Sequence, residues 1–589
     1  MKKFYYLCGA AALFLSSPSL SLSAENGNVP EANDEKSRIL LVENEVDDQA
    51  MSTQESRGNY TDQALNFIES NQDVLGIAEP DQELELIEET EDEHGMTHIR
   101  YQQVVNGVPV EGHQLLVHFN ADGTMSSVNG NYHEAQSAVS TSAVHLSTED
   151  AVNEAKHHVD APDHLEYKPT AELIMYPMGD ELVTVYKVNI NFMGEEPGDW
   201  HVFVNAENGE IVDRYNTIGH LAEDAGLEVE DISPAPVEEN PLMQIRQLPE
   251  DIDRSDFGPM HGSGFGVLGD YRVLNMAYKI SDIPQGTFKL YDWTRPDFEG
   301  IYTYDMKNQF PSSGFGLPGD PFTNDTAGFN SSYDAPGVDA HYNSLRVYEY
   351  YLEEHGRNSL DDEGAPLIST ANYGDNFNNA FWNGRQMAYG NGDGQQFIPL
   401  SAGLDVAAHE ITHGVITNTA NLMYRFESGA VNESIADIFG VLVDDSSWDI
   451  GDDIIGEAWL AEGRTALRSL EEPGKFPVND AYVEYGNGSG VFPAHMDEFY
   501  DMPIQVDNGG VHVNSSIINH AAFLIGDDIG REALGNIVYR ALTVYLTPIS
   551  NFDDTRFAFV QSAVDIYGEG SEEATSTRNG FDGVGIYEE

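Results

Sequence analysis

The sequence is almost without cysteine. Among its 589 residues only Cys8 occurs, within an N-terminal stretch that has the pattern of a secretory signal. Residues 1–24 begin with a basic pair, continue with an apolar run too short to cross a bilayer, and end in small residues. Cleavage near residue 24 leaves a chain that cannot form disulfides, so its stability must come from packing or bound ions. We therefore expect a secreted, extracellular protein that keeps no membrane attachment once the signal is removed.

The sequence also has few basic side chains. Lys and Arg number 28 against 100 Asp and Glu, which gives a formal net charge of -72. This balance excludes nucleic-acid binding through a basic surface and makes an anionic membrane an unfavourable partner. Hydrophobic residues still make up 40% of the chain, enough for folded cores. We favour adaptation to a saline medium, where ions screen the self-repulsion; the alternative is an ordinary acidic secreted protein that its charge keeps soluble.

The first part of the chain has the pattern of small modules followed by a linker. Residues 25–145 and 146–220 each combine a helical pattern, at 61–71 and at 148–158, with strand-like runs, which predicts two small α+β modules. Residues 221–256 hold eleven acidic residues, four prolines and only two basic residues. That composition is typical of an extended linker that is open to proteolysis.

The motif His409-Glu410-Ile411-Thr412-His413 carries the strongest chemical signal. Within a helix it places both histidines on one face, one turn apart, where they can bind a single metal ion. Glu433 follows with 19 residues between it and His413, and a second helix could present it as a third ligand. Two imidazoles, one carboxylate and an open fourth position are the ligand set of catalytic zinc. For the motif alone, two hydrogen-bonded structural histidines are the alternative.

The segment around Glu433 supports the metal site. Asp437 lies one helical turn after Glu433, where it can accept the free N–H of a ligating histidine and fix the tautomer of that histidine. We expect Asn432, the neighbour of Glu433, to support the ligands in a similar way. Position 419 is threonine, so the third histidine that would indicate the metzincin class of zinc peptidases is absent.

Several motifs elsewhere accompany this pattern. They are Tyr333-Asp334-Ala335-Pro336, Val338-Asp339-Ala340-His341, Asn378 to Gly384, Met387 to Gly390, Asp507 to His512 and Ala541 to Leu546. With the zinc spacing, they make residues 258–589 resemble the thermolysin family of zinc metalloendopeptidases. The resemblance implies a two-lobed α+β zincin, with a β-rich N-terminal lobe at 257–410 and a mainly helical C-terminal lobe at 411–589. The residue patterns predict strand-like segments to about residue 320, and helical patterns dominate from residue 335 to the end.

The resemblance also implies the catalytic roles of four residues. Glu410 takes a proton from the attacking water and returns it to the leaving amine. Tyr424 and His512 match the two donors that stabilise the negative charge on the carbonyl oxygen. Asp507 matches the carboxylate that orients His512 and favours its charged form.

Substrate binding follows from the same resemblance. Asn379 and the backbone of Ala380 match the edge that pairs with an extended peptide, and Arg468 matches an arginine that holds a substrate carbonyl. Five apolar residues match the pocket for the residue after the scissile bond: Phe397, Leu400, Val406, Ile450 and Leu467. We expect protein and peptide substrates, cut before Leu, Ile, Val or Phe.

Structural calcium is the second kind of ion that the resemblance implies, besides one catalytic zinc. Four carboxylates match its main site: Asp405, Asp444, Asp449 and Asp452. Oxygen ligands of this kind suit calcium. Ser447 stands where a further carboxylate is expected, so the number of calcium ions stays open. In so acidic a chain, ordinary surface charge is the alternative for these aspartates.

The upstream modules resemble the propeptide of the same family. Residues 25–145 resemble its fungalysin/thermolysin-type module, and residues 146–220 resemble a PepSY-type module. The resemblance implies an intramolecular folding assistant and inhibitor that self-cleavage removes, a mature N-terminus between about 240 and 258, and a monomer without a further C-terminal domain. A catalytically inactive secreted binding protein on a zincin scaffold is the alternative. The intact Glu410, Tyr424 and His512 argue against it.

Salt adaptation makes a measurable prediction. Activity should persist or rise in molar NaCl, because dissolved ions screen the repulsion among the excess carboxylates. Peptidase activity and melting temperature, measured from low salt to molar salt, test this. A steady fall of both from low salt upward would rule out salt adaptation and leave the peptidase hypothesis untouched.

Overall fold

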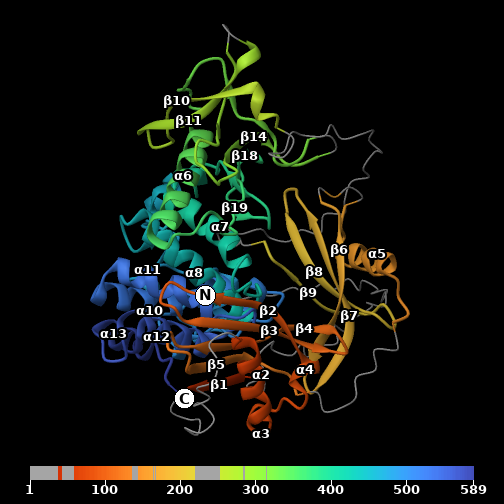
Figure 1. Ribbon diagram of the computed structural model, residues 1–589. Coiled ribbons are helices and arrows are strands. Elements are labelled where there is room, and N and C mark those ends of the chain that lie inside the picture. The colour runs from red at the N-terminus through yellow and green to blue at the C-terminus, as the bar shows by residue number, and fades with distance from the viewer. Residues whose placement is uncertain are drawn as a thin grey trace, which may run out of the picture.

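The computed structural model of the chain describes residues 38–42, 59–134, 144–162, 165, 167–218, 252–282, 286–312 and 315–588. The predicted export signal and most of the predicted linker lie outside these residues. None of the helices in the described ranges has the length and apolar character that a membrane crossing requires. Figure 1 shows the upstream strands, coloured red to yellow-orange, beside and below the helices that make up the C-terminal part of the chain.

The two upstream modules share one sheet of nine strands. The elements of the first module are β1 (Arg38–Val42), α2 (Tyr60–Ser70), α3 (Gln72–Leu75), α4 (Pro80–Glu83), β2 (Leu84–Glu91), β3 (Thr97–Val105), β4 (Val108–Phe119) and β5 (Met125–Asn131). Those of the second are α5 (Thr148–His158), β6 (Thr170–Met178), β7 (Glu181–Phe192), β8 (Gly198–Asn205) and β9 (Ile211–Asn216). The strand order is β1-β5-β4-β6-β7-β8-β9, with β3 paired to β4 and β2 paired to β3.

Each module keeps its own helix and its own core. Asn59 and Ser147 cap α2 and α5, because their side chains accept the backbone N–H of Asp62 and of Asp150. One hydrophobic cluster lies under α2 and another under α5. The modules join where Val110 of β4 pairs in parallel with Met175 of β6. The sheet is therefore continuous although its cores are separate.

The next part of the chain is rich in strands. A five-stranded sheet contains β10 (Phe257–Phe265), β11 (Tyr271–Lys279), β12 (Phe288–Lys289), β16 (Thr323–Asn324) and β17 (Gly328–Phe329). A six-stranded sheet contains β13 (Tyr291–Asp292), β14 (Ile301–Gln309), β15 (Asp320–Pro321), β18 (Leu367–Tyr373), β19 (Ala380–Trp382) and β20 (Met387–Gly390). Helix α6 (Ala335–His355) separates β17 from β18 in the chain.

The helical pattern that dominates from residue 335 does not extend over residues 367–390, whose strands the sequence reasoning missed. Helix α6 begins as expected, but strands β18 to β20 follow it. β18 lies between β14 and β20 and pairs in parallel with both. Six of its seven residues are buried. A strand enclosed on both faces has no polar alternation, so its pattern does not distinguish it from a buried helix.

The C-terminal part is mainly helical. Its α-helices are α7 (Leu404–Thr417), α8 (Phe426–Asp444), α9 (Glu457–Glu462), α10 (Asp507–Ile529), α11 (Arg531–Arg540), α12 (Phe552–Tyr567) and α13 (Glu572–Gly583). Two short strands, β21 (Asp449–Ile450) and β22 (Arg468–Ser469), pair with each other. The predicted lobe boundary at residue 410 falls inside α7.

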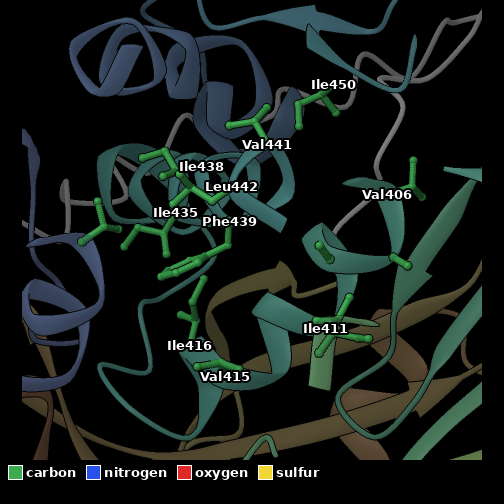
Figure 2. Packing of buried hydrophobic residues seen from close by; sticks show 14 of the residues in the cluster. Val406, Ile411, Val415, Ile416, Ile435, Ile438, Phe439, Val441, Leu442 and Ile450 are labelled. Carbon is green, nitrogen blue, oxygen red and sulfur yellow. The ribbon is translucent and has the colours of Figure 1, made fainter. Parts of the chain in front are cut away.

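Helices α7 and α8 pack at the centre of the largest core. In Figure 2, Ile416 of α7 and Phe439 of α8 point toward one another, and both are fully buried. Phe439 also contacts Tyr351 of α6, with 5.2 Å between the ring centroids. The three helices therefore share one apolar contact region.

Helix α7 is enclosed on all sides. Every residue from Asp405 to Ile416 is buried. A helix without a solvent face must satisfy its polar side chains inside the protein, because an unpaired buried polar group costs free energy. The histidines and glutamate of the metal-binding motif lie in this enclosed stretch, so the fold has to supply partners for the histidines and bury the glutamate with or without one.

Replacing Phe439 tests the role of this contact region. Phe439→Ala should lower the free energy of unfolding by about 3–5 kcal/mol, because it leaves a cavity between α7 and α8. Thermal unfolding in a Glu410→Ala background, which prevents self-digestion, measures the effect. Leu352→Ala is the matched control, since Leu352 on α6 is 39% exposed and should change stability by less than about 1 kcal/mol. Equal shifts in the two variants would contradict the packing argument.

Candidate active site

The histidine pair and a glutamate converge at one point between α7 and α8. The Nε2 atoms of His409 and His413 lie 3.1 Å apart. Glu433 of α8 places its carboxylate oxygens 3.5 Å from Nε2 of His409 and 3.4 Å from Nε2 of His413. Among the described residues, this is the one group of three or more His, Cys, Asp or Glu side chains whose ligand atoms lie within 4.8 Å of one another.

The outer nitrogens of both histidines face oxygen acceptors. Nδ1 of His409 lies 2.9 Å from the carboxylate of Asp437, and Nδ1 of His413 lies 2.8 Å from Oδ1 of Asn432. An oxygen acceptor at Nδ1 keeps the proton there and leaves the lone pair on Nε2. Two lone pairs that face each other at this distance need a cation between them. The donor set therefore fits zinc, and the two predicted supporting residues are in place.

Asp437 is itself held from two sides. Nε and Nη2 of Arg468 donate to its two oxygens at 2.8 Å each. Nδ2 of Asn519 on α10 donates to it at 2.8 Å, and Ser434 donates to Oδ1 of Asn519 at 2.8 Å. Burial disfavours the charged form, but Arg468 and His409 outweigh burial and lower the pKa of Asp437 to about 2. Sequence reasoning missed Asn519. The one sequence feature that could have indicated its role is an amide side chain within the largely apolar stretch that forms α10.

Glu410 stands apart from the ligands. It is fully buried, and neither of its carboxylate oxygens has a hydrogen-bond partner among the described residues. Burial raises the pKa of Glu410 to about 8, with His413 offsetting part of the effect. A buried carboxylate without a partner beside a metal site is suited to exchanging protons with bound water or substrate.

A tyrosine and a histidine border the same site. Tyr424 donates to Glu433, and its Oη lies 3.0 Å from Nε2 of His512. His512 bonds to Asp507 through Nδ1, and its backbone N–H donates to the same carboxylate at 3.0 Å. Burial would lower the pKa of His512, but the carboxylates of Glu433 and Asp507 outweigh burial and raise it to about 9. His512 therefore carries a positive charge near neutral pH.

The loop that presents His512 depends on its glycines. Asn508, Gly509 and Gly510 all have φ between 46° and 88°, which kinks the start of α10. A Cβ on Gly509 would lie 2.3 Å from the ring of Phe426. Glycine is therefore required there both by the left-handed backbone and by the close approach of Phe426.

Family comparisons agree with this geometry. The catalytic domain of thermolysin metallopeptidases matches residues 261–417, and their alpha-helical domain matches residues 420–586. The chain belongs to the thermolysin family of metallopeptidases. A fungalysin/thermolysin propeptide motif matches residues 82–132, and a peptidase propeptide and YPEB domain matches residues 146–215. The predicted thermolysin-like zymogen with two propeptide modules is confirmed, and so is its enzymatic class.

Individual relatives cover most of the chain. The thermolysin of Alicyclobacillus acidocaldarius subsp. acidocaldarius is 37% identical over 527 residues, 86% of this chain and 86% of that protein. A bacillolysin of Bacillus cereus is 36% identical over 509 residues, 83% of this chain and 82% of that protein. Among solved structures, the precursor of protealysin, a metalloproteinase from Serratia proteamaculans, is 30% identical with a TM-score of 0.42, over 49% of this chain and 87% of that one.

Apart from Arg468, the predicted substrate residues of this thermolysin-family chain lie in two settings, the end of a sheet and the largest core. Ala380 begins β19, which is the last strand in its sheet, and Asn379 directly precedes it. The five predicted pocket residues all belong to the largest hydrophobic cluster: Phe397, Leu400, Val406, Ile450 and Leu467. Each is at most 3% exposed.

The predicted calcium ligands are less closely grouped. Asp405 lies at the start of α7, and its carboxylate accepts the backbone N–H of Val406 at 2.8 Å and that of Gly451. Lys475 pairs with Asp449 at 2.7 Å, and Ser447 donates to Asp452 at 3.1 Å. Within the described residues, no three of these carboxylates come within a common ligand distance. Burial, helped by the charges of two neighbouring aspartates, raises the pKa of Asp405 to about 8.

The propeptide lies against the catalytic centre. A cavity of about 270 Å³ is lined by His413 and Tyr424 on one side and by Ile174 and Tyr215 of the upstream sheet on the other. Figure 1 shows the strands β6 to β9 beside α7 and α8. The upstream sheet thus forms one wall of the space in front of the metal ligands.

The convergence of ligands predicts zinc content. Purified protein should carry about one zinc ion per chain, and His413→Ala should lose nearly all of it, because two remaining ligands bind zinc weakly. Metal analysis by inductively coupled plasma mass spectrometry measures this. Glu410→Gln is the matched control, since it should also remain uncut yet keep its zinc. Zinc retention by His413→Ala would contradict the ligand assignment.

Proposed function

We propose that this metallopeptidase is a secreted, salt-tolerant zinc endopeptidase made as a self-processing zymogen, which cuts internal peptide bonds before Leu, Ile, Val or Phe. The observation that carries the proposal is the convergence of two Nε2 lone pairs and Glu433 beside the unpartnered carboxylate of Glu410. Bound zinc would polarise a water molecule and the substrate carbonyl.

The chain's own residues account for the remaining chemistry. Glu410 takes the proton of the attacking water and delivers it to the leaving amine, because its carboxylate is not engaged elsewhere among the described residues. Tyr424 and His512 donate to the carbonyl oxygen as negative charge develops on it, and Asp507 keeps His512 charged.

Substrate selection follows from the edge strand and the apolar cluster. An extended peptide adds to β19 at Asn379 and Ala380, where main-chain hydrogen bonds provide affinity. The five apolar residues favour a bulky apolar side chain after the scissile bond, since burying one yields roughly 1.5–3 kcal/mol. Arg468 supports the site through Asp437 and, on this proposal, also contacts a substrate carbonyl.

Calcium and the propeptide complete the proposal. Calcium would bind at Asp405 with Asp444, Asp449 and Asp452, because a buried carboxylate surrounded by like charges is stabilised by a cation. Upstream residues act as an intramolecular inhibitor because their sheet borders the cavity in front of the zinc ligands. Self-cleavage in the linker of the exported precursor then frees a monomeric mature enzyme.

The Glu410→Ala variant tests this function. It should retain zinc, lose at least about 10³-fold in activity and remain an uncut precursor, because the proton-transfer group is missing. Cleavage of casein and of a blocked furylacryloyl-Gly-Leu-amide peptide, with and without a zinc chelator, measures activity of the processed wild type. Failure of the wild type to cut either substrate would disprove the endopeptidase function, whereas unaided maturation of Glu410→Ala would disprove self-processing.

A further inference from the structure

Arg425 is a buried cation directly beside the catalytic centre. It follows Tyr424 in the chain and precedes the first residue of α8. Its side chain is 3% exposed. A buried guanidinium is costly unless it is paired, and in a chain with only 28 basic residues such a position calls for an explanation.

The partners of the Arg425 guanidinium come from the propeptide. Nη1 donates to Oη of Tyr176 on β6 at 3.0 Å and forms an ion pair with Asp213 on β9. Tyr176 in turn donates to Asp213, whose side chain is 2% exposed. The rings of Tyr176 and Tyr215 lie 5.9 and 5.3 Å from the guanidinium carbon. The propeptide thus supplies one carboxylate and two aromatic rings to Arg425.

Removal of the propeptide changes this environment completely. The carboxylate, the hydroxyl and both rings leave together, because all of them lie on β6 or β9. In addition, Nε of Arg425 has no hydrogen-bond partner among the described residues even in the precursor. A guanidinium presents parallel N–H groups that match a carboxylate in a two-point contact, and Asp213 uses only part of this capacity.

Arg425 lies behind a residue that lines the cavity in front of the metal ligands. Tyr215, whose ring lies against the guanidinium, also lines the cavity of about 270 Å³ that Tyr424 and His413 line. Once Tyr215 leaves with the propeptide, the space that it occupied adjoins both the cavity and the guanidinium of Arg425.

We propose that Arg425 forms a carboxylate-binding site beside the catalytic centre, which Asp213 occupies in the precursor and an acidic side chain of the substrate occupies in the mature enzyme. The proposal rests on the endopeptidase function. It runs against the long-range field of the mature enzyme, because residues 257–589 hold 50 Asp and Glu against 16 Lys and Arg and so repel acidic peptides. A preference for an acidic residue would therefore require a local cation.

Paired peptides test the mature enzyme. Both peptides of a pair carry the same single cleavage site before Leu. They differ at one position near that site, where one peptide has Glu and the other has Gln, and a separate pair is made for each neighbouring position. At one position, the wild type should show a kcat/KM for the Glu peptide roughly tenfold above that for Gln, as a charge-assisted hydrogen bond provides. Arg425→Gln should abolish this ratio, and Arg425→Lys should retain part of it.

The outcomes separate this inference from the function on which it rests. A wild type that cuts both peptides without preferring Glu at any position, or an Arg425→Gln enzyme that keeps the preference, overturns the inference alone. A wild type that cuts no peptide overturns the endopeptidase function instead. If Arg425→Gln does not fold, the wild-type ratio of kcat/KM for the Glu and Gln peptides at each position still tests the inference, because the absence of a Glu preference at every position would overturn it.

The precursor tests the occupant. Asp213→Asn in the full-length chain should mature several-fold faster than the wild type, because the guanidinium loses its charged partner while the shape is kept. The mature enzyme made from the Asp213→Asn precursor should keep the wild-type ratio of kcat/KM for the Glu and Gln peptides, since cleavage has removed residue 213 with the propeptide. Glu181→Gln, at an exposed position on β7 of the same sheet, is the matched control. Equal maturation of Asp213→Asn and Glu181→Gln overturns the role of Asp213.

Discussion

The architecture depends on the need to pair the polar groups of an enclosed helix. α7 has no solvent face along the stretch that carries the metal-binding motif, so its imidazoles must find partners on neighbouring elements, while Glu410 is left without one among the described residues. Asp437 and Asn432 of α8 hold the outer nitrogens of the histidines, and Arg468 and Asn519 hold Asp437. The inner nitrogens face each other and accept a metal ion. The same packing that encloses α7 therefore orients its metal ligands.

The propeptide uses both polar and apolar contacts with the catalytic part. Asn191 donates to the carbonyl of Asn383 at 3.0 Å, and Tyr373 donates to the carbonyl of Gly194 at 2.7 Å. Met193 and Ile218 join the apolar cluster that contains Tyr373. Polar groups at an interface are rehydrated when its halves separate, whereas a purely apolar interface would leave a large patch exposed. This mixture is compatible with the proposed removal of the propeptide.

The scarcity of basic residues acquires a structural meaning. Arg425, Arg468 and Arg540 are each no more than 5% exposed, and each is paired with a buried aspartate. For Asp437, burial alone would favour the neutral form, and Arg468 with His409 outweighs burial and keeps its pKa low. Three of the few cations are thus placed inside the protein, each beside an aspartate. The excess of acidic groups remains a property of the surface and its surroundings.

The sequence by itself determined the metal-binding motif, the family and the likeness of the upstream modules to a propeptide, because ligand spacing on one helix and turn residues are local features. It also located most strands and helices, but not β18 to β20, where burial on both faces removes the alternation that marks a strand. Only the tertiary structure joined the two modules into one sheet and brought Asn519 to Asp437. It alone placed Asp213 on Arg425, since contacts between residues more than two hundred positions apart depend on packing that no local pattern encodes.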